Sequence, residues 1–169
     1  MITKDELFNK LDGLGIEHST VSHPALFTVA DSQKLHGELP GGHSKNLFLK
    51  DKKGNLFLIV AEQSSQVDLK TLHKRIGSQR LSFGKPELLM EVLGMVPGSV
   101  NPFSLMNDTK MRCTLWLDEA LLSHELVNFH PLENTFTTTL KSADLLQFVE
   151  DIGFVANRIE FTVAAADPS

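Results

Sequence analysis

The stretch Asn46-Leu47-Phe48-Leu49-Lys50-Asp51-Lys52-Lys53-Gly54-Asn55-Leu56-Phe57-Leu58-Ile59-Val60 decides the fold of this chain. Two apolar runs, 46–50 and 55–60, flank four polar or turn-forming residues, and this pattern predicts a β-hairpin. Gly54 stands where such a turn requires a positive φ. The second run is apolar on both faces, so we expect it to be a central strand covered on both sides.

Periodic patterns on either side of the hairpin predict further helices and strands. Thr3 and Glu6 form a capping box before an apolar stripe that ends at Gly13 or Gly15. Further helices are expected at 28–35, 69–76, 86–93 and 142–153, and further strands at 16–22, 80–83, 112–117, 125–129 and 135–140. The pattern predicts a mixed α/β (α+β) fold, with flanking helices packed on a mostly antiparallel mixed sheet.

Length and composition place the chain among soluble globular proteins. Its 169 residues favour one domain, which we expect over 1–163 with a disordered tail at 164–169. The N-terminus does not resemble a signal peptide, and the longest apolar run, 56–61, is too short to span a membrane. The single cysteine, Cys113, excludes an internal disulfide and a cysteine metal cluster, and we expect it to be buried and inert. A cytoplasmic location is the default expectation.

Basic residues gather in one part of an acidic chain whose net charge is −5. Between residues 45 and 85 three acids accompany nine bases: Lys45, Lys50, Lys52, Lys53, Lys70, Lys74, Arg75, Arg80 and Lys85. A local basic patch on an acidic protein can attract a phosphate backbone. Ordinary solvated charges at hairpin and helix ends explain the same pattern equally well.

Three segments combine polar or backbone-exposing residues with apolar neighbours: Lys45-Asn46, Gly98–Pro102 and 128–132 around His130. A lysine at a strand start can reach a phosphate, and Asn46 could orient a carbonyl or hydroxyl. The glycine-containing loop could offer free backbone N–H groups to an oxyanion. Taken singly, a solvated lysine, a plain connecting loop and a structural histidine are equally ordinary interpretations. Together they suit a small ester or acyl group.

The sequence lacks the motifs of several other kinds of enzyme. The chain contains no G-x-S-x-G, no H-E-x-x-H, no G-x-G-x-x-G and no G-K-[ST] loop. We therefore expect no metal site, no nucleotide cofactor and no serine nucleophile.

In this order the segments resemble the YbaK/ProX (PrdX) family, free-standing homologues of the editing (INS) domain of prolyl-tRNA synthetase. The resemblance runs from His23-Pro24-Ala25 through Gly42-His43-Ser44-Lys45-Asn46-Leu47-Phe48-Leu49 to 128–134 and the 142–153 helix. It is greatest to the ProX type, which acts on alanyl-tRNA(Pro). It implies a trans-editing deacylase that hydrolyses the ester of a mischarged tRNA(Pro) without a cofactor.

The resemblance also implies roles for single residues. Lys45 would be the family's essential lysine near the terminal adenosine, with Asn46 and His130 as polar pocket residues. The family's G-x-x-x-P loop, which lines the aminoacyl pocket, would be Gly98, Ser99, Val100, Asn101 and Pro102. Leu47, Val100 and Phe103 are candidate pocket walls, and the terminal ribose hydroxyl would take part in the reaction.

Substrate and partners remain open between several hypotheses. The aminoacylated 3′ end of a tRNA is the expected partner, with prolyl-tRNA synthetase as a second one and no membrane. Lys50, Lys52, Lys53, Lys74, Arg75 and Arg80 are weaker candidates for tRNA contacts. The mischarged amino acid could instead be cysteine or serine. A non-catalytic nucleic-acid-binding module is the alternative from another class.

Overall fold

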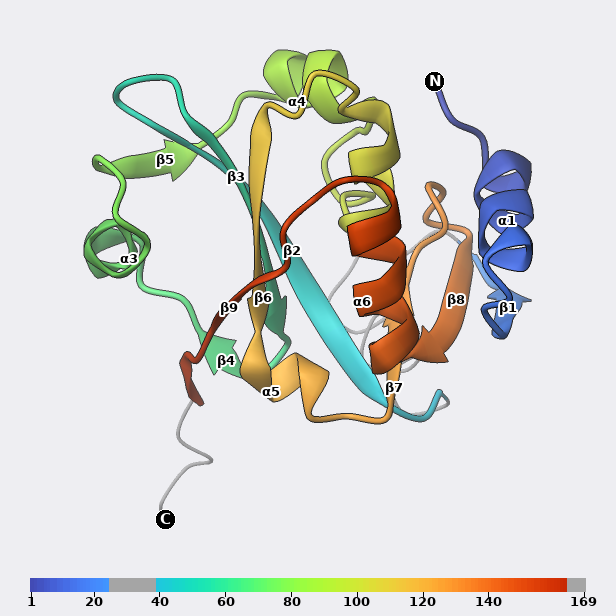
Figure 1. Cartoon of the computed structure of the whole chain (residues 1–169). Coiled ribbons are helices and arrows are strands. Elements are labelled where there is room, and N and C mark those ends of the chain that lie inside the picture. Colours follow the sequence, from blue (N-terminus) through green and yellow to red (C-terminus); the bar gives the residue numbers. More distant parts are fainter. Residues whose placement is uncertain (25–38, 164–169) are drawn as a thin grey trace.

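An eight-stranded mixed sheet forms the centre of the fold in a computed structural model that describes residues 1–24 and 39–163 (Figure 1). Its strand order is β1-β8-β7-β2-β3-β6-β9, and β5 pairs with β2 beside this path. The strands are β1 (His18–Ser22), β2 (Gly42–Asp51), β3 (Leu56–Glu62), β5 (Leu81–Phe83), β6 (Cys113–Asp118), β7 (Leu126–Phe129), β8 (Phe136–Lys141) and β9 (Asn157–Ile159). A separate small sheet pairs β4 (Ser65–Gln66) with β10 (Thr162–Val163).

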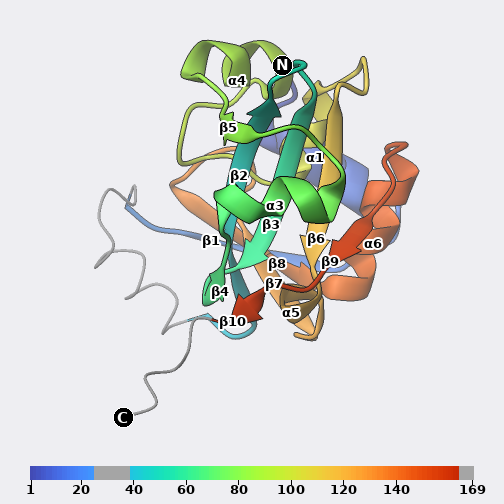
Figure 2. The ribbon, with the colours of Figure 1, turned by 90° about the vertical axis from the view of Figure 1, so that its left-hand side faces the viewer.

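Helices cover both faces of the sheet, and each face has its own core. The helices are α1 (Lys4–Gly13), α3 (Leu69–Ile76), α4 (Pro86–Leu93), α5 (Glu119–Leu122), α6 (Ser142–Asp151) and the 3-10 helix η1 (Pro102–Asn107). The larger core joins the sheet to α1, α4, η1 and α6, and in it the Phe103 ring packs edge-on against Phe129 and Phe148. The smaller core lies under α3, which crosses in front of β2 and β3 in Figure 2. Every residue of β3 is buried, as expected for a central strand.

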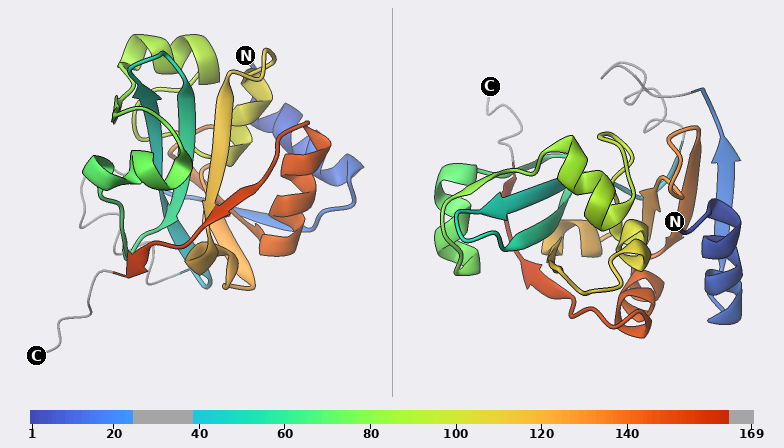
Figure 3. Two further views of the ribbon diagram at one scale, coloured as in Figure 1. Left: turned by 60° about the vertical axis from the view of Figure 1, so that its left-hand side comes forward. Right: turned by 90° about the horizontal axis from the view of Figure 1, so that it is seen from above.

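Strand β2 has a divided edge that matters for the rest of the molecule. One edge pairs continuously with β3, from Ser44↔Glu62 to Lys50↔Leu56. The other edge pairs in parallel with β7 only at Gly42 and His43, and antiparallel with β5 only from Leu49 onward. Among the described residues no strand pairs with that edge at 44–47. This unpaired stretch, the β2 gap, separates two parts of the sheet whose strong curvature is visible in Figure 3.

The Asp51 carboxylate holds the hairpin turn between β2 and β3. It accepts hydrogen bonds from the Lys53 and Asn55 backbone N–H groups, from the Asn55 side chain and from the Gln79 N–H. Burial raises the pKa of Asp51, but these hydrogen bonds outweigh that effect and hold it below its ordinary value of 3.8. The same side chain thereby ties the turn to the segment that enters β5.

Most expected elements are confirmed. The sheet is mixed and mostly antiparallel, as expected, and its parallel pairs are β2·β7, β3·β6 and β6·β9. The short strands β4, β9 and β10 and the helix η1 had no clear periodic pattern. Helix α6 begins at Ser142, as expected, and Lys141 is its N-cap residue. The expected helix at 28–35 and tail at 164–169 lie outside the described residues. Cys113 is buried in β6, and burial raises the pKa of its thiol.

Replacing Asp51 tests the role of the turn. We expect Asp51→Asn to lower the free energy of unfolding by about 1–3 kcal/mol at pH 7, because a buried charged acceptor of several hydrogen bonds is lost. The folded pKa is depressed, so the advantage of the wild type is present above pH 3.8 and disappears as the pH falls through the folded value. Chemical denaturation from pH 7 to pH 2 measures both.

The exposed Asp5→Asn variant is the control, since the Asp5 side chain lies 88% exposed. A wild-type advantage over Asp51→Asn that grows on acidification would contradict this account.

Candidate functional site

Lys45 and His130 flank the point where β2 and β7 separate. The parallel pairing of these strands ends at His43↔Asn128, and each of the two residues follows two positions later. Because strand side chains alternate, Lys45 and His130 lie on the same face of the sheet as His43 and Asn128. Lys45 is half-buried and forms no ion pair or hydrogen bond with any described residue. A lysine ammonium in that setting is suited to an anionic or strongly polar ligand group.

His130 is held at a fixed orientation by the turn that follows it. Its Nδ1 lies 2.9 Å from the Phe136 carbonyl oxygen, which can only accept, so Nδ1 carries the proton in this contact. The His130 carbonyl accepts from the Leu132 N–H at 2.8 Å and from the Asn101 side chain. Leu132 has a φ of 70°, a left-handed conformation that a branched side chain rarely adopts. The strained turn is therefore part of what positions the imidazole.

Asn128 and Gly41 position the start of β2, and with it Lys45. The Asn128 amide donates to the Pro40 and Gly42 carbonyl oxygens at 2.9 and 3.2 Å and accepts from the Thr139 hydroxyl at 2.5 Å. Gly41 has a φ of +96°, and a Cβ there would lie 2.5 Å from the Leu126 carbonyl oxygen. Only glycine allows this close approach.

Asn46 lies on the opposite face of β2 from Lys45. It shares the side of the sheet with Phe48 and the larger core, and its Nδ2 donates to Ser44 Oγ at 3.1 Å. The Asn46 Oδ1 atom is buried and has no hydrogen-bond partner among the described residues. Such an orphan acceptor indicates a site for a donor group, because burying it unsatisfied costs free energy. Because Lys45 and Asn46 lie on opposite faces of β2, one ligand could contact both only at the strand edge, and the β2 gap leaves that edge unpaired among the described residues.

The loop Gly98–Pro102 reaches the site through Asn101. This buried side chain accepts from the Phe103 N–H at 2.9 Å and donates to the Ser99 carbonyl at 3.1 Å and to the His130 carbonyl. Asn101 is thus occupied in joining the loop to His130. Only Gly98 of the loop is exposed; its φ is +94° and the space beside its Cα is open.

One expectation about this loop needs correction. The Ser99 N–H is not free, because it donates to the Val96 carbonyl at 3.1 Å. Phe103 and Val100 are buried in the larger core, and Leu47 packs on the smaller one. Their roles as pocket walls stay a prediction.

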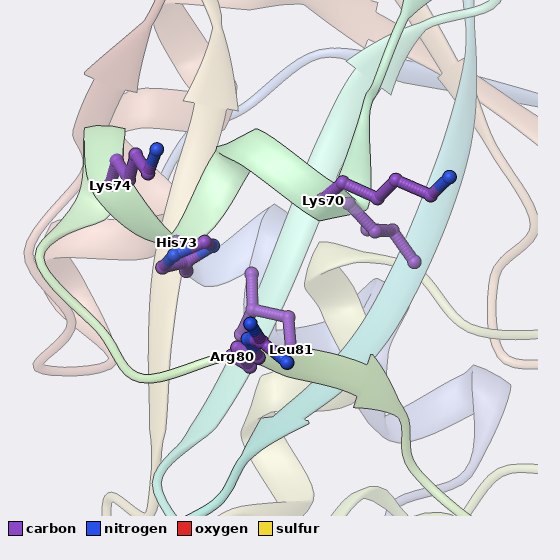
Figure 4. A pocket seen from close by; sticks show the side chains of 6 residues that line it. Lys70, His73, Lys74, Arg80 and Leu81 are labelled. Carbon is purple, nitrogen blue, oxygen red and sulfur yellow. The ribbon is translucent and has the colours of Figure 1, made fainter.

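The six basic candidates for nucleic-acid contacts separate into three groups. Lys50, Lys52 and Lys53 belong to the β2–β3 hairpin. Lys74 and Arg80 line a cavity of about 510 Å³ between α3 and β5, together with Leu69, Lys70, His73 and Leu81 (Figure 4). Arg75 is used structurally: its guanidinium donates to the Glu160 carbonyl and lies 5.6 Å from the centre of the Phe161 ring.

His23 lies beside His130, although the sequence indicated only the end of a strand at this position. Its ring centroid lies 5.9 Å from that of His130. Its Nδ1 contacts the Pro24 carbonyl at 2.9 Å and its Nε2 the Thr137 hydroxyl at 2.8 Å. The two imidazoles come together through the pairing of β1 with β8, a contact more than a hundred residues apart in the chain. Among residues 1–24 and 39–163, no group of three or more histidine, cysteine or acidic side chains could hold a metal, and no helix is long and apolar enough to cross a membrane.

Comparisons with known proteins agree on one family. The family model described as the aminoacyl-tRNA editing domain matches residues 23–148. A protein of Acetoanaerobium sticklandii named prolyl-tRNA editing protein ProX is 34% identical over 161 residues, which are 95% of this chain and 98% of that protein. Prolyl-tRNA synthetase associated domain-containing protein 1 of Danio rerio is 36% identical over 150 residues, 88% of this chain and 82% of that protein.

A solved structure supports the same fold. A crystal structure described as a candidate trans-editing enzyme for prolyl tRNA synthetase superposes with a TM-score of 0.72. The match covers 96% of this chain and 98% of that chain at 20% sequence identity. At this identity the likeness establishes the mixed α/β architecture with its flanking helices.

Replacing Asn101 tests whether this residue holds the site together. We expect Asn101→Ala to lower the free energy of unfolding by about 1–3 kcal/mol, because the Phe103 N–H and the Ser99 and His130 carbonyls lose their partner in a buried environment. Thermal or chemical denaturation measures the change. Asn9→Ala on the exposed side of α1 is the matched control, and we expect it to change stability by less than about 0.5 kcal/mol. Equal stability of the two variants would show that the Asn101 bonds are dispensable.

Proposed function

The chain belongs to the aminoacyl-tRNA editing domain family and is an aminoacyl-tRNA deacylase, and from this premise we propose that it hydrolyses alanyl-tRNA(Pro) in trans. Its substrate is a tRNA carrying an amino acid on its 3′ end. The observation that carries the proposal is the β2 gap. Lys45 lies there on the same face of the sheet as His130, whose ring contacts the Phe136 carbonyl, and the opposite face carries the Asn46 amide oxygen, which has no partner among the described residues.

The physical need for such an enzyme explains the choice of alanine. A synthetase pocket shaped for proline cannot strongly exclude the smaller alanine, because the missing methylenes are worth only about 1–3 kcal/mol. A second site that hydrolyses the wrong ester corrects the error. An aminoacyl ester is already activated, so positioning a water molecule and stabilising the developing oxyanion can suffice without a side-chain nucleophile.

Each site residue has a role in this proposal. Lys45 binds the phosphate or ribose of the terminal adenosine through its ammonium group. His130 acts as a polar pocket residue that binds or orients the ester or its attacking water, and its ring is held by the Phe136 carbonyl. The Asn46 Oδ1 atom accepts from the substrate's α-amino or hydroxyl group and so loses its unsatisfied state.

The loop contributes space and orientation. Gly98 lets the loop backbone approach the aminoacyl group, since no side chain fills the open space beside its Cα. Asn101 keeps the loop attached to the His130 carbonyl, so that pocket and imidazole move together. Pro102 begins η1 and gives the chain a fixed direction away from the site.

Prolyl-tRNA synthetase is the proposed protein partner. Names of the relatives and of the solved structure associate them with that synthetase, and a free-standing editing enzyme gains by receiving its substrate before the tRNA leaves. A non-catalytic binding module is not favoured, because the family is defined by editing. Cysteine and serine remain alternative mischarged amino acids, distinguished by the experiment below.

Hydrolysis of four esters tests the substrate. We expect alanyl-tRNA(Pro) to be hydrolysed faster than the cysteinyl, seryl and prolyl forms, because the proposed second site corrects the misacylation that a proline pocket cannot exclude. Lys45→Ala should lower kcat/KM for alanyl-tRNA(Pro) by about 10²- to 10³-fold, as for loss of one transition-state contact. Release of labelled amino acid from each tRNA measures the rates.

Lys110→Ala provides the matched control, because this lysine is exposed in the turn before β6. It should act like the wild type. Faster hydrolysis of the cysteinyl or seryl ester would move the substrate to that amino acid. Full activity of Lys45→Ala would remove the proposed role of the β2 gap.

The salt dependence of tRNA binding tests the basic residues. We expect the double variant Lys74→Gln and Arg80→Gln to bind tRNA(Pro) more weakly and to reduce the slope of log K against log salt by roughly 1.5, about 0.7–0.9 per lost phosphate contact. Arg158→Gln on β9 serves as the matched control. Filter binding or fluorescence anisotropy between 50 and 200 mM salt gives the slopes. An unchanged slope would mean that the α3–β5 cavity does not contact the phosphate backbone.

A further inference from the structure

Phe83 is an aromatic side chain that the fold does not bury. It is 60% exposed, although phenylalanine normally contributes to a core. It occupies the last position of β5, opposite Leu49 of β2, and therefore lies on the same face as Leu49. The next residue, Gly84, approaches the Phe48 ring so closely that a Cβ there would lie 2.3 Å from it. The tight backbone contact at Gly84 fixes β5, and with it the position of Phe83.

The surroundings of Phe83 are cationic. Arg80 precedes it on the same segment, Lys85 follows Gly84, and both are exposed. Arg80 also lines the α3–β5 cavity with Lys70 and Lys74, and none of the described residues that line this cavity is acidic (Figure 4). An exposed aromatic ring beside a cluster of cations is the combination by which proteins bind single-stranded nucleic acid: the ring stacks on a base and the cations bind the backbone.

His73 adds an unused polar group to this cavity. Its Nδ1 atom is buried and has no hydrogen-bond partner among the described residues. A phosphate in the cavity would have its charge neutralised by Lys70, Lys74 and Arg80. The cavity could thus bind the phosphate of a nucleotide, and the Phe83 ring could stack on its base.

The path from Phe83 to Lys45 follows an edge of β2. Both β5 and the β2 gap lie on the edge of β2 that β3 does not occupy, and β5 ends at Phe83, opposite Leu49. Leu49 lies four residues from Lys45, which is about 14 Å at roughly 3.4 Å per residue. Leu49 itself is fully buried in the smaller core, so the face of β2 is not open to a ligand. A strand of a few nucleotides would therefore run along the edge, from Lys45 at the β2 gap to Phe83.

We propose that Phe83 stacks on an unpaired base near the 3′ end of the tRNA while the α3–β5 cavity holds a backbone phosphate next to it. This proposal rests on the proposed function, because it takes Lys45 as the end at which the terminal adenosine sits. Stacking is tolerant of sequence, since every base has an aromatic face. The subsite would orient the 3′ end for every tRNA that the enzyme accepts, leaving discrimination to the aminoacyl pocket.

Kinetics on Phe83 variants test the stacking. We expect Phe83→Ala to raise the KM for aminoacyl-tRNA by about 5- to 100-fold with kcat nearly unchanged, the loss that removal of one stacked base brings. Phe83→Trp should keep or lower the KM, because a larger ring stacks at least as well. Val155→Ala, another exposed apolar residue, is the matched control and should leave both constants unchanged.

Fluorescence gives a second readout that does not depend on catalysis. Trp116 is the chain's single tryptophan, so the double variant Trp116→Phe and Phe83→Trp carries one indole at the proposed stacking position. Its emission should be quenched by uncharged tRNA(Pro) with an intact 3′ end and not by the same tRNA trimmed of its unpaired end. Quenching in a protein that hydrolyses no ester would support the subsite and remove only the proposed function.

Two results would overturn the subsite. One is a KM for Phe83→Ala equal to that of the wild type, together with emission that intact tRNA leaves unchanged, in an enzyme that still hydrolyses its ester. The other is an unchanged KM accompanied by lost binding to prolyl-tRNA synthetase, which would make Phe83 a contact for a protein.

Discussion

The pairing of β2 with β3 is the constraint on which the rest of the structure depends. Because β3 is buried along its whole length, both faces of this pair must be covered, and the two cores follow from that requirement. Because β3 occupies one edge of β2, all other strands that meet β2 share its second edge. Within residues 1–24 and 39–163, the two short partners β7 and β5 pair with that edge and leave the β2 gap between them. The site residues gather at this interruption in the sheet.

The same face of the sheet is apolar in one part of the sheet and polar in the other. Over β3 and β6 this face is apolar and lies under α3, whereas over β7 and β8 it carries Asn128, His130, Thr137 and Thr139. The polar part is extensively hydrogen-bonded, so its side chains have few alternative positions. Lys45 stands at the boundary. A cation there has a rigid polar neighbourhood on one side and an apolar one on the other, which favours a ligand with a charged group and an apolar part.

Local sequence patterns predicted the elements well and their assembly less well. The hairpin 46–60 and the helix cap at Thr3 reflect interactions within a few residues, and both are confirmed. The Glu6 carboxylate contacts the Thr3 hydroxyl and not the Thr3 N–H, so only one half of the capping box is present. The parallel partners of β2 and β6 depend on contacts across the whole chain, which periodicity does not contain. Very short strands such as β9 have no period to detect.

In the candidate site, too, some features could be predicted from the sequence and others could not. Lys45, His130 and the Gly98 loop could be selected from residue type and from family resemblance. The side of the strand that each residue faces follows from alternation alone, and it separates Lys45 from Asn46. Asn101 was predicted as a ligand contact, and residue type alone did not indicate that its side chain also joins the loop to His130. His23 could not be predicted, because its neighbour His130 is brought to it by strand pairing far along the sequence.

The β2 gap also bears on how such a protein can change over evolution. An unpaired strand edge is a template on which a second chain can add itself, and charged residues on the edge are a common protection against this. Lys45 places a positive charge in the gap, and this charge disfavours the addition of a second chain at that edge. A descendant that lost the activity could not replace the lysine with an apolar residue without exposing the edge. It would have to replace it with another charge or a proline, or shorten the gap, to avoid aggregation.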